Sequence, residues 1–220
     1  MDTNGEKTMG HYFIGLDLGQ SQDFTAVAIL ERAEVKGEWD AALFTHRKMT
    51  SLRLRYLERI PLGTPYPDVV ERVREVAGLR DLRGNCHLMV DATGVGRPVV
   101  DLLRRAGLGC QIMAATITSG NAETSSKGYY HVPKRDLIVG LQVLLQRGAL
   151  QVAAGMMLGP ALVEEMATMQ VRQTAAGNVQ YGAWREGEHD DLVFAVALAY
   201  WGAKKVYPRP LNGDDGHWVR

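Results

Sequence analysis

The sequence predicts an α/β fold in which helices flank a mixed β-sheet. Three strand-like segments come first, and the turn-rich or charged stretches between them suit hairpins, which favours antiparallel pairing. Helical and strand-like segments then alternate up to residue 204, a pattern typical of parallel strands covered by helices. With 220 residues, the chain is long enough for one domain with a substantial core and short for two.

In the first half of the chain, strands are expected over 11–18, 24–31 and 41–48 because these runs are apolar or β-branched between turn-rich stretches. A helix is expected over 66–79, where apolar residues recur at helical spacing. A short apolar run that ends in an acid predicts a further strand over 86–91.

In the second half, a helix over 99–105 and a strand over 109–115 come first. The polar segment 118–131 contains Gly and Ser and is long for an ordered connection, so a mobile functional loop is predicted there. Pro133 near its start and Gly148 after its end favour a helix over 137–146. The remaining elements are a helix over 157–169, a hairpin over 170–185 turning at Gly177-Asn178, and a very apolar helix over 191–204.

The expected domain covers 11–206, between a flexible leader (1–10) and a flexible Pro/Gly-rich tail (207–220). No apolar run approaches the ~18 residues of a membrane span, and the N-terminus lacks the apolar stretch of a signal peptide. We therefore expect a soluble, cytoplasmic protein without a membrane partner.

The net charge does not indicate nucleic-acid binding, because the charges of 25 basic and 25 acidic side chains cancel. Any such partner would have to meet a local basic surface. Cys86 and Cys110 show neither CxxC nor metal-ligand spacing and lie in or beside apolar runs. They are predicted to be reduced thiols in the core.

Acidic residues stand at three places where a buried element ends. Asp17 lies in the apolar run IGLDL, Asp91 closes LMV, and His189-Asp190-Asp191 opens the apolar helix. Because the carboxyl ends of parallel strands meet at one sheet edge, Asp17 and Asp91 are expected to be neighbours. Converging carboxylates suit Mg²⁺ or Mn²⁺, and a pair of such metals supports phosphodiester hydrolysis.

Each acid also has an ordinary structural interpretation when taken singly. Asp17 would accept hydrogen bonds from the amides of 19–21. Asp91 would brace the turn over 93–96, and either Asp190 or Asp191 would be a good helix N-cap. The three sites together, in this order and on these elements, favour a functional site.

Four segments resemble the successive motifs of the nuclease domain of tailed-phage terminase large subunits. They are FIGLDLGQSQDFTAVAIL, LMVDATGVGRPVVDLL, HVPKRDLIVGLQVLLQRGALQV and EGEHDDLVFAVALAYW, which together span most of residues 12–202. The resemblance implies a ribonuclease H-like fold and metal-dependent endonuclease activity on concatemeric double-stranded phage DNA during genome packaging. It also implies portal protein, terminase small subunit and an ATPase motor as partners.

Carried over to this chain, the resemblance makes Asp17, Asp91 and Asp190 the metal ligands, with Asp191 beside them. Adjacent residues point about 100° apart on a helix, so one of the last pair is the primary ligand, and Asp190 at the helix mouth is favoured. Asp23 and His189 are auxiliary candidates, with a simple turn residue as the alternative for Asp23.

Basic residues are candidates for contacts with DNA. Lys134 and Arg135 would orient a phosphate near the metals, with solvated positions at a helix start as the alternative for both. Lys127 would touch the DNA backbone from the loop, with an ordinary flexible loop as its alternative. The run Arg53, Arg55 and Arg59 is expected to be a solvated face and ranks below the loop as a DNA contact.

The chain departs from a complete terminase large subunit because nothing in it matches the GxxxxGK[ST] motif of an ATPase motor. Two enzyme alternatives stay open. One is a Holliday junction resolvase or transposase of the ribonuclease H-like class, and the other is an actin-like or sugar-kinase-like ATP-binding domain, suggested by IGLDLGQS and VDATGVGRP. A non-catalytic assembly module is the third possibility, against which the intact acids argue.

Overall fold

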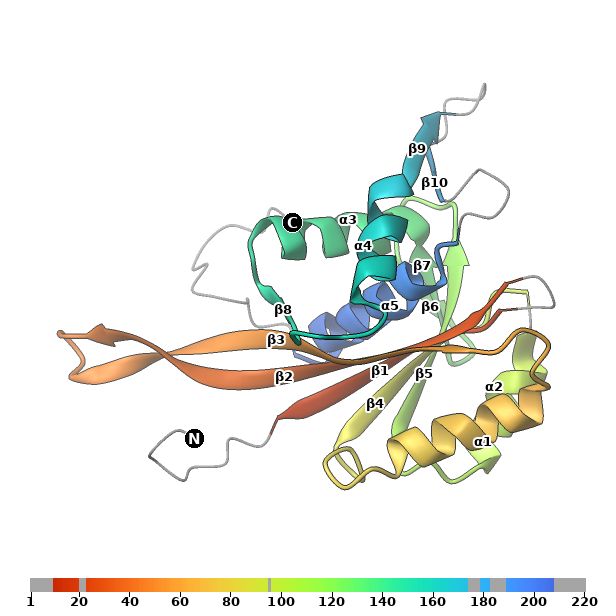
Figure 1. Ribbon diagram of the computed structural model, residues 1–220, viewed down its shortest axis with the longest axis horizontal. Helices are drawn as coiled ribbons and strands as arrows, with labels where there is room; N and C mark the ends of the chain where they lie inside the picture. The colour runs from red at the N-terminus through yellow and green to blue at the C-terminus, as the bar shows by residue number, and fades with distance from the viewer. Residues whose placement is uncertain (1–9, 20–22, 95, 174–178, 183–188, 208–220) are drawn as a thin grey trace.

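The computed structural model describes residues 10–19, 23–94, 96–173, 179–182 and 189–207. Within them, an eight-stranded mixed sheet has the strand order β6, β7, β5, β4, β1, β2, β3, β8, and β9 pairs with β10 apart from it (Figure 1). The strands are β1 (His11–Asp17), β2 (Thr25–Asp40), β3 (Thr45–Ile60), β4 (Cys86–Asp91), β5 (Gln111–Thr118), β6 (Thr124–Ser126), β7 (Tyr129–Pro133), β8 (Leu150–Val152), β9 (Gln170–Gln173) and β10 (Val179–Gly182). The helices are α1 (Tyr66–Ala77), α2 (Gly96–Arg105), α3 (Lys134–Gln146), α4 (Gly159–Thr168) and α5 (Asp191–Val206).

The predicted fold class is confirmed. β1, β2 and β3 pair antiparallel, whereas β4 pairs parallel with β1 and with β5, which in turn pairs parallel with β7. The predicted hairpin over 170–185 is present as β9 and β10, and its predicted turn at Gly177-Asn178 lies outside the described residues.

The second and third strands are longer than predicted. β2 continues to Asp40 and β3 begins at Thr45, so the two form a ribbon that projects past the rest of the sheet (Figure 1). The predicted third strand, 41–48, instead contains the turn at the tip of this ribbon. The charged residues after Ala33 do not alternate with apolar ones, because this part of the ribbon lies outside the core, so the sequence pattern does not reveal the strand.

The prediction of one continuous loop over 118–131 is wrong, because this segment contains strands. β5 extends to Thr118, and β6 and β7 form a hairpin at the edge of the sheet. β6 is exposed and only three residues long, so it has the polar composition expected of a loop. β8, equally short and half-exposed, was not predicted either.

Buried side chains form a core on each face of the sheet in the described part of the chain. α3, α4 and α5 cover one face, and α1 and α2 cover the other (Figure 1). α5 passes directly over β1 at Gly15, where an added Cβ would stand 1.9 Å from the carbonyl oxygen of Ala195. Glycine at this position therefore allows the close approach of helix and strand.

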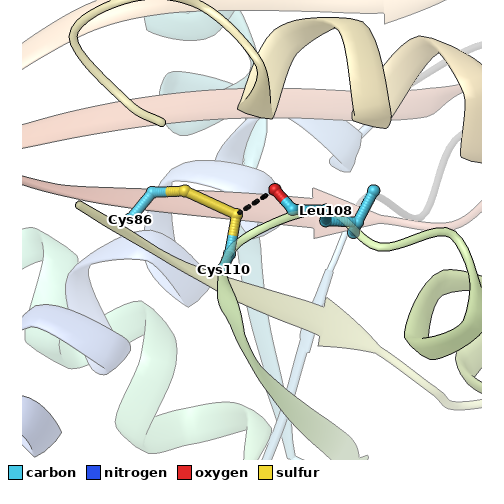
Figure 2. Close-up of a disulfide and its surroundings, with 3 residues drawn as sticks. All are labelled: Cys86, Leu108 and Cys110. Atoms are coloured by element: carbon cyan, nitrogen blue, oxygen red, sulfur yellow. Dashed lines mark hydrogen bonds between the residues drawn. A yellow bond between two sulfur atoms is a disulfide. The ribbon is translucent and has the colours of Figure 1, made fainter. Parts of the chain in front are cut away.

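Cys86 and Cys110 form a disulfide, so the prediction of two reduced thiols is wrong (Figure 2). β4 and β5 pair parallel with His87 opposite Gln111, which sets the two preceding cysteines side by side with their Cα atoms 5.1 Å apart. The separation of 24 residues in sequence concealed this pairing. The disulfide joins the beginnings of the two strands, at the end of the sheet opposite Asp91.

The predicted leader and tail lie outside the described residues except for Gly10 and Tyr207. Both of these contact the domain: Asn85 donates a side-chain hydrogen bond to the Gly10 carbonyl, and the Tyr207 hydroxyl lies 2.9 Å from Nδ1 of His11. Among the described helices, none is both long and apolar enough to span a membrane.

Candidate functional site

The sheet brings Asp17 and Asp91 to the same edge and the same face. They are the last residues of the adjacent parallel strands β1 and β4, whose register pairs Leu16 with Val90. Leu16 and Val90 belong to the core under α1 and α2. Since side chains alternate along a strand, Asp17 and Asp91 point to the opposite face, which α5 covers.

The beginning of α5 completes a cluster of acids at this edge. Burial raises the pKa of Asp17 well above its ordinary value, and the negative charges of Asp91, Asp190 and Asp191 raise it further. Burial also raises the pKa of Asp91, although its Oδ1 accepts a hydrogen bond of 2.8 Å from the Thr93 amide. The nearby cation of Lys134 opposes both rises in pKa. The charges of the other three carboxylates therefore act on Asp17, the most deeply buried acid of this edge.

Asp190 occupies the N-cap position of α5, but its side chain makes no capping hydrogen bond within the described residues. The amide of Val193, the usual target of such a cap, donates instead to Oε2 of Glu165 on α4 at 3.0 Å. The Asp190 carboxylate is partly exposed, and its Oδ2 lies 3.6 Å from Nζ of Lys134. The N-cap interpretation of its side chain is therefore wrong.

Asp191 has a different environment, because it is buried and bonded to Arg59. Nε of Arg59 donates to Oδ2 at 2.8 Å and Nη2 donates to Oδ1 at 3.3 Å. The same guanidinium pairs with Glu165. Burial raises the pKa of Asp191 and Arg59 lowers it, while burial and the charge of Asp191 raise the pKa of Glu165 to about 7.

Sequence reasoning missed Arg59 and Glu165 as members of this site. Arg59 was grouped with Arg53 and Arg55 as a solvated face, yet it lies 132 residues before its partner Asp191. One signal for Glu165 was present: it follows Leu162 by three residues, so it falls on the buried stripe of an apolar helix. An acid in that position requires a partner.

The other predicted site residues lie at various distances from the acids. Lys134 joins them, with its ammonium 4.4 Å from the ring centroid of Phe194. His189 is adjacent, with Nδ1 4.0 Å from Oδ1 of Asp191. Asp23 is exposed on the connection between β1 and β2. Arg135 has other partners: its Nε lies 3.2 Å from Oδ1 of Asp136, and its Nη2 donates to the Asn121 carbonyl at 3.4 Å.

Lys127 is not brought to the acids. It lies in the tight turn between β6 and β7 with a φ of 51°. β7 begins just beyond this turn and runs toward the acidic edge, so Lys127 stands at its far end. There it lines a cavity of about 730 Å³ with Tyr129, Tyr130 and Lys205.

The donor set fits a hard divalent cation by its chemistry. Carboxylate oxygens are the ligands preferred by Mg²⁺ and Mn²⁺. The pKa of Asp17 is raised first by burial and then by the negative charges of Asp91, Asp190 and Asp191, which a cation would neutralise. In the part of the chain that the structure describes, no three His, Cys, Asp or Glu side chains stand close enough together to form a complete metal site. The acids are thus gathered at one edge without forming a preassembled cage.

No protein-family profile and no curated protein sequence matches this chain. Solved structures do match it. The nuclease domain of the large terminase from Thermus phage P74-26 is 22% identical, with a TM-score of 0.60 over 96% of this chain and 84% of that chain. The chain has the ribonuclease H-like fold of large terminase nucleases.

Two further structures with this fold contain divalent metal. The large terminase nuclease from thermophilic phage G20c with bound magnesium is 23% identical, with a TM-score of 0.59 over 87% of this chain and 81% of that chain. The nuclease domain of the large terminase subunit of bacterial virus Sf6 with manganese is 15% identical, with a TM-score of 0.56 over 89% of this chain and 90% of that chain. The fold expected from the sequence resemblance is confirmed.

Proposed function

We propose that this protein is a metal-dependent DNA endonuclease that cuts concatemeric double-stranded phage DNA during genome packaging in an infected bacterial cell. The observation that carries the proposal is the meeting of Asp17, Asp91 and Asp190 at one edge of a ribonuclease H-like sheet. The magnesium and manganese in the G20c and Sf6 nucleases support divalent-metal dependence.

In this proposal Asp17, Asp91 and Asp190 hold Mg²⁺ or Mn²⁺ in a two-metal site. Bound there, the metals would activate water and stabilise the leaving oxygen of the phosphodiester. Asp190 is the preferred third ligand because its carboxylate is partly exposed, whereas both oxygens of Asp191 are bonded to Arg59. Asp191 remains next to the site and contributes to its negative charge.

Basic residues around the acids would guide the DNA. Lys134 stands beside Asp190 and would attract the phosphate to be cut, because a cation at the rim offsets the charge of the carboxylates. Arg135, the next residue, would contact the DNA backbone beside that phosphate. Lys127 stands apart at the far end of β7, so it would contact DNA only if the bound duplex extended from the acids to that end of the strand.

The same resemblance to large terminases leads us to propose a larger assembly. An ATPase motor domain, terminase small subunit and portal protein are the expected partners. The motor would be a separate domain or chain, because this sequence carries no GxxxxGK[ST] motif.

A plasmid-nicking assay tests the activity. The wild type should convert supercoiled DNA to nicked and linear forms with Mg²⁺ or Mn²⁺, and EDTA or Asp17→Asn should abolish this conversion. Asp101→Asn is the matched control, because Asp101 is an exposed acid on α2 and should be dispensable.

Other outcomes would redirect the assignment. Cleavage confined to four-way junctions would indicate a resolvase-type nuclease. No cleavage, combined with ATP hydrolysis that depends on Asp17, would contradict the nuclease and favour the kinase-like alternative.

A further inference from the structure

Arg59 of β3 links this strand to α4 and to the beginning of α5. It stands next to the end of β3, and its guanidinium is shared by Asp191 of α5 and Glu165 of α4. The side chains of Asp191 and Glu165 are each 5% exposed, and that of Arg59 is 22% exposed. The three charges are therefore held together largely out of water.

Glu165 has a second contact that fixes the helix itself. Its Oε2 accepts the amide hydrogen of Val193 at 3.0 Å, while its Oε1 pairs with Arg59. The first amides of a helix have no partner inside the helix, so a carboxylate from a neighbouring helix stabilises them. This contact from α4 leaves the Asp190 side chain free of capping, so it can face Lys134 and the other acids.

Stability alone does not explain such an arrangement. The desolvation of buried charges offsets most of their mutual attraction, so a buried ion pair contributes little net stability compared with apolar packing. Orientation is a better explanation, because Arg59 bonds both oxygens of Asp191 and thereby fixes the carboxylate plane. Residue 191 also follows Asp190 directly, so fixing one restricts the other.

We propose that Arg59 and Glu165 are positioning residues of the acidic site, which hold Asp191 and the first turn of α5 so that Asp190 is aimed at Asp17 and Asp91. This inference rests on the proposed metal-dependent nuclease. Neither residue needs to touch DNA or metal. Loss of partners that orient metal ligands typically weakens metal affinity or activity by roughly 10–100-fold.

The experiment measures Mn²⁺ binding by calorimetry and DNA cleavage against Mn²⁺ concentration, with the full chain. Arg59→Gln should raise the Mn²⁺ dissociation constant and the half-saturating Mn²⁺ concentration at least about tenfold. Arg59→Lys keeps the charge but not the paired hydrogen bonds, so it should recover only part of the loss. Glu165→Gln retains an acceptor for Val193 and should be milder than Glu165→Ala.

Arg72→Gln is the matched control. Arg72 also bridges two carboxylates, with Nε 3.0 Å from Glu58 and Nη1 2.8 Å from Glu75, but it lies on α1 across the sheet. Its loss should leave Mn²⁺ binding and cleavage unchanged. A melting temperature is recorded for each variant, so that unfolding is separated from misplacement of the acids.

The outcomes separate this inference from the proposed function. A wild type that cuts DNA, together with an Arg59→Gln protein whose Mn²⁺ affinity is unchanged, overturns the positioning role alone. The positioning role is also overturned if Arg59→Gln weakens DNA binding and reduces the salt dependence of that binding, because Arg59 would then be a phosphate contact. If the wild type binds Mn²⁺ through Asp17 but cuts no DNA, the nuclease is overturned and weaker Mn²⁺ binding in Arg59→Gln still supports positioning. A wild type that binds no Mn²⁺, with or without DNA, overturns both.

Discussion

The ammonium of Lys134 lies 3.6 Å from the Asp190 carboxylate, which joins the first residue of α3 to the residue before α5. The same lysine also lowers the pKa of Asp17 and of Asp91 against the effect of burial. One cation thus faces acids from three separate elements. It limits their repulsion before metal binds and is placed to meet an incoming phosphate.

Lys134→Gln should therefore slow DNA cleavage by at least about tenfold at saturating Mn²⁺, because removal of a well-placed charge stabiliser typically has an effect of this size or larger. Lys134→Arg should retain part of the activity, since the charge remains. The measurement is the initial rate of plasmid nicking at several Mn²⁺ concentrations. Wild-type rates in Lys134→Gln would show that the lysine only occupies the surface.

The stability of the metal-free protein should fall as the pH rises from about 5 to about 8. The folded-state pKa of Glu165 is about 7, and those of Asp17, Asp91 and Asp191 are also raised, so between the unfolded and folded pKa values the native state holds more protons than the unfolded state. By linkage, the free energy of unfolding then decreases with pH in this window. Thermal unfolding in EDTA across this pH range tests the sign.

Added Mn²⁺ and the variant Asp17→Asn test whether repulsion between the acids causes this pH dependence. Mn²⁺ at pH 8 should restore stability, because it neutralises the ionised acids that repel one another. Asp17→Asn should raise the melting temperature at pH 8 by about 2–4 °C, equivalent to about 1 kcal/mol for a chain of this size, and should flatten the pH dependence. A melting temperature that increases steadily with pH in EDTA would contradict the proposed repulsion.

Asp91→Asn should abolish cleavage and leave the melting temperature unchanged or slightly higher. The amide oxygen of Asn can still accept the hydrogen bond from the Thr93 amide, and the loss of one negative charge relieves Asp17. Nicking assays and thermal unfolding of the same preparation provide the measurement. An unfolded variant would mean that Asp91 serves mainly to brace the turn that follows β4.

The role of a site residue could be predicted from the sequence where that role follows from the residue's own strand or helix. Asp17, Asp91 and Asp190 each end or open an element that its own apolar pattern reveals, so the sequence predicted the acidic edge. Arg59 could not be assigned in the same way, because its partners come 106 and 132 residues later and only the packing of α4 and α5 on the sheet unites them. The disulfide likewise depends on the pairing of β4 with β5.

The polar segments show a second reason why sequence patterns miss parts of the fold. The strands of the β2–β3 ribbon and of the β6–β7 hairpin are held by backbone pairing with little burial at their exposed ends, so hydrophobic alternation does not reveal them. Sequence patterns report burial more directly than pairing. The core elements were therefore predicted well, and the edge and the projecting ribbon were not.

Gly15→Ala should disturb the acidic site from the middle of β1. The added methyl would stand 1.9 Å from the Ala195 carbonyl oxygen, so α5 would have to move away from the strand. Overpacking of this kind costs about 1–3 kcal/mol, and we expect a lower melting temperature together with weaker Mn²⁺ binding, because α5 carries Asp190 and Asp191 at its beginning. Gly140→Ala is the control: its Cβ would meet only two Tyr200 ring carbons, at 3.4 and 3.7 Å, and alanine is favoured over glycine in a helix interior by about 1 kcal/mol. If Gly15→Ala binds Mn²⁺ as tightly as the wild type, the close contact between α5 and β1 is not what sets the acids in place.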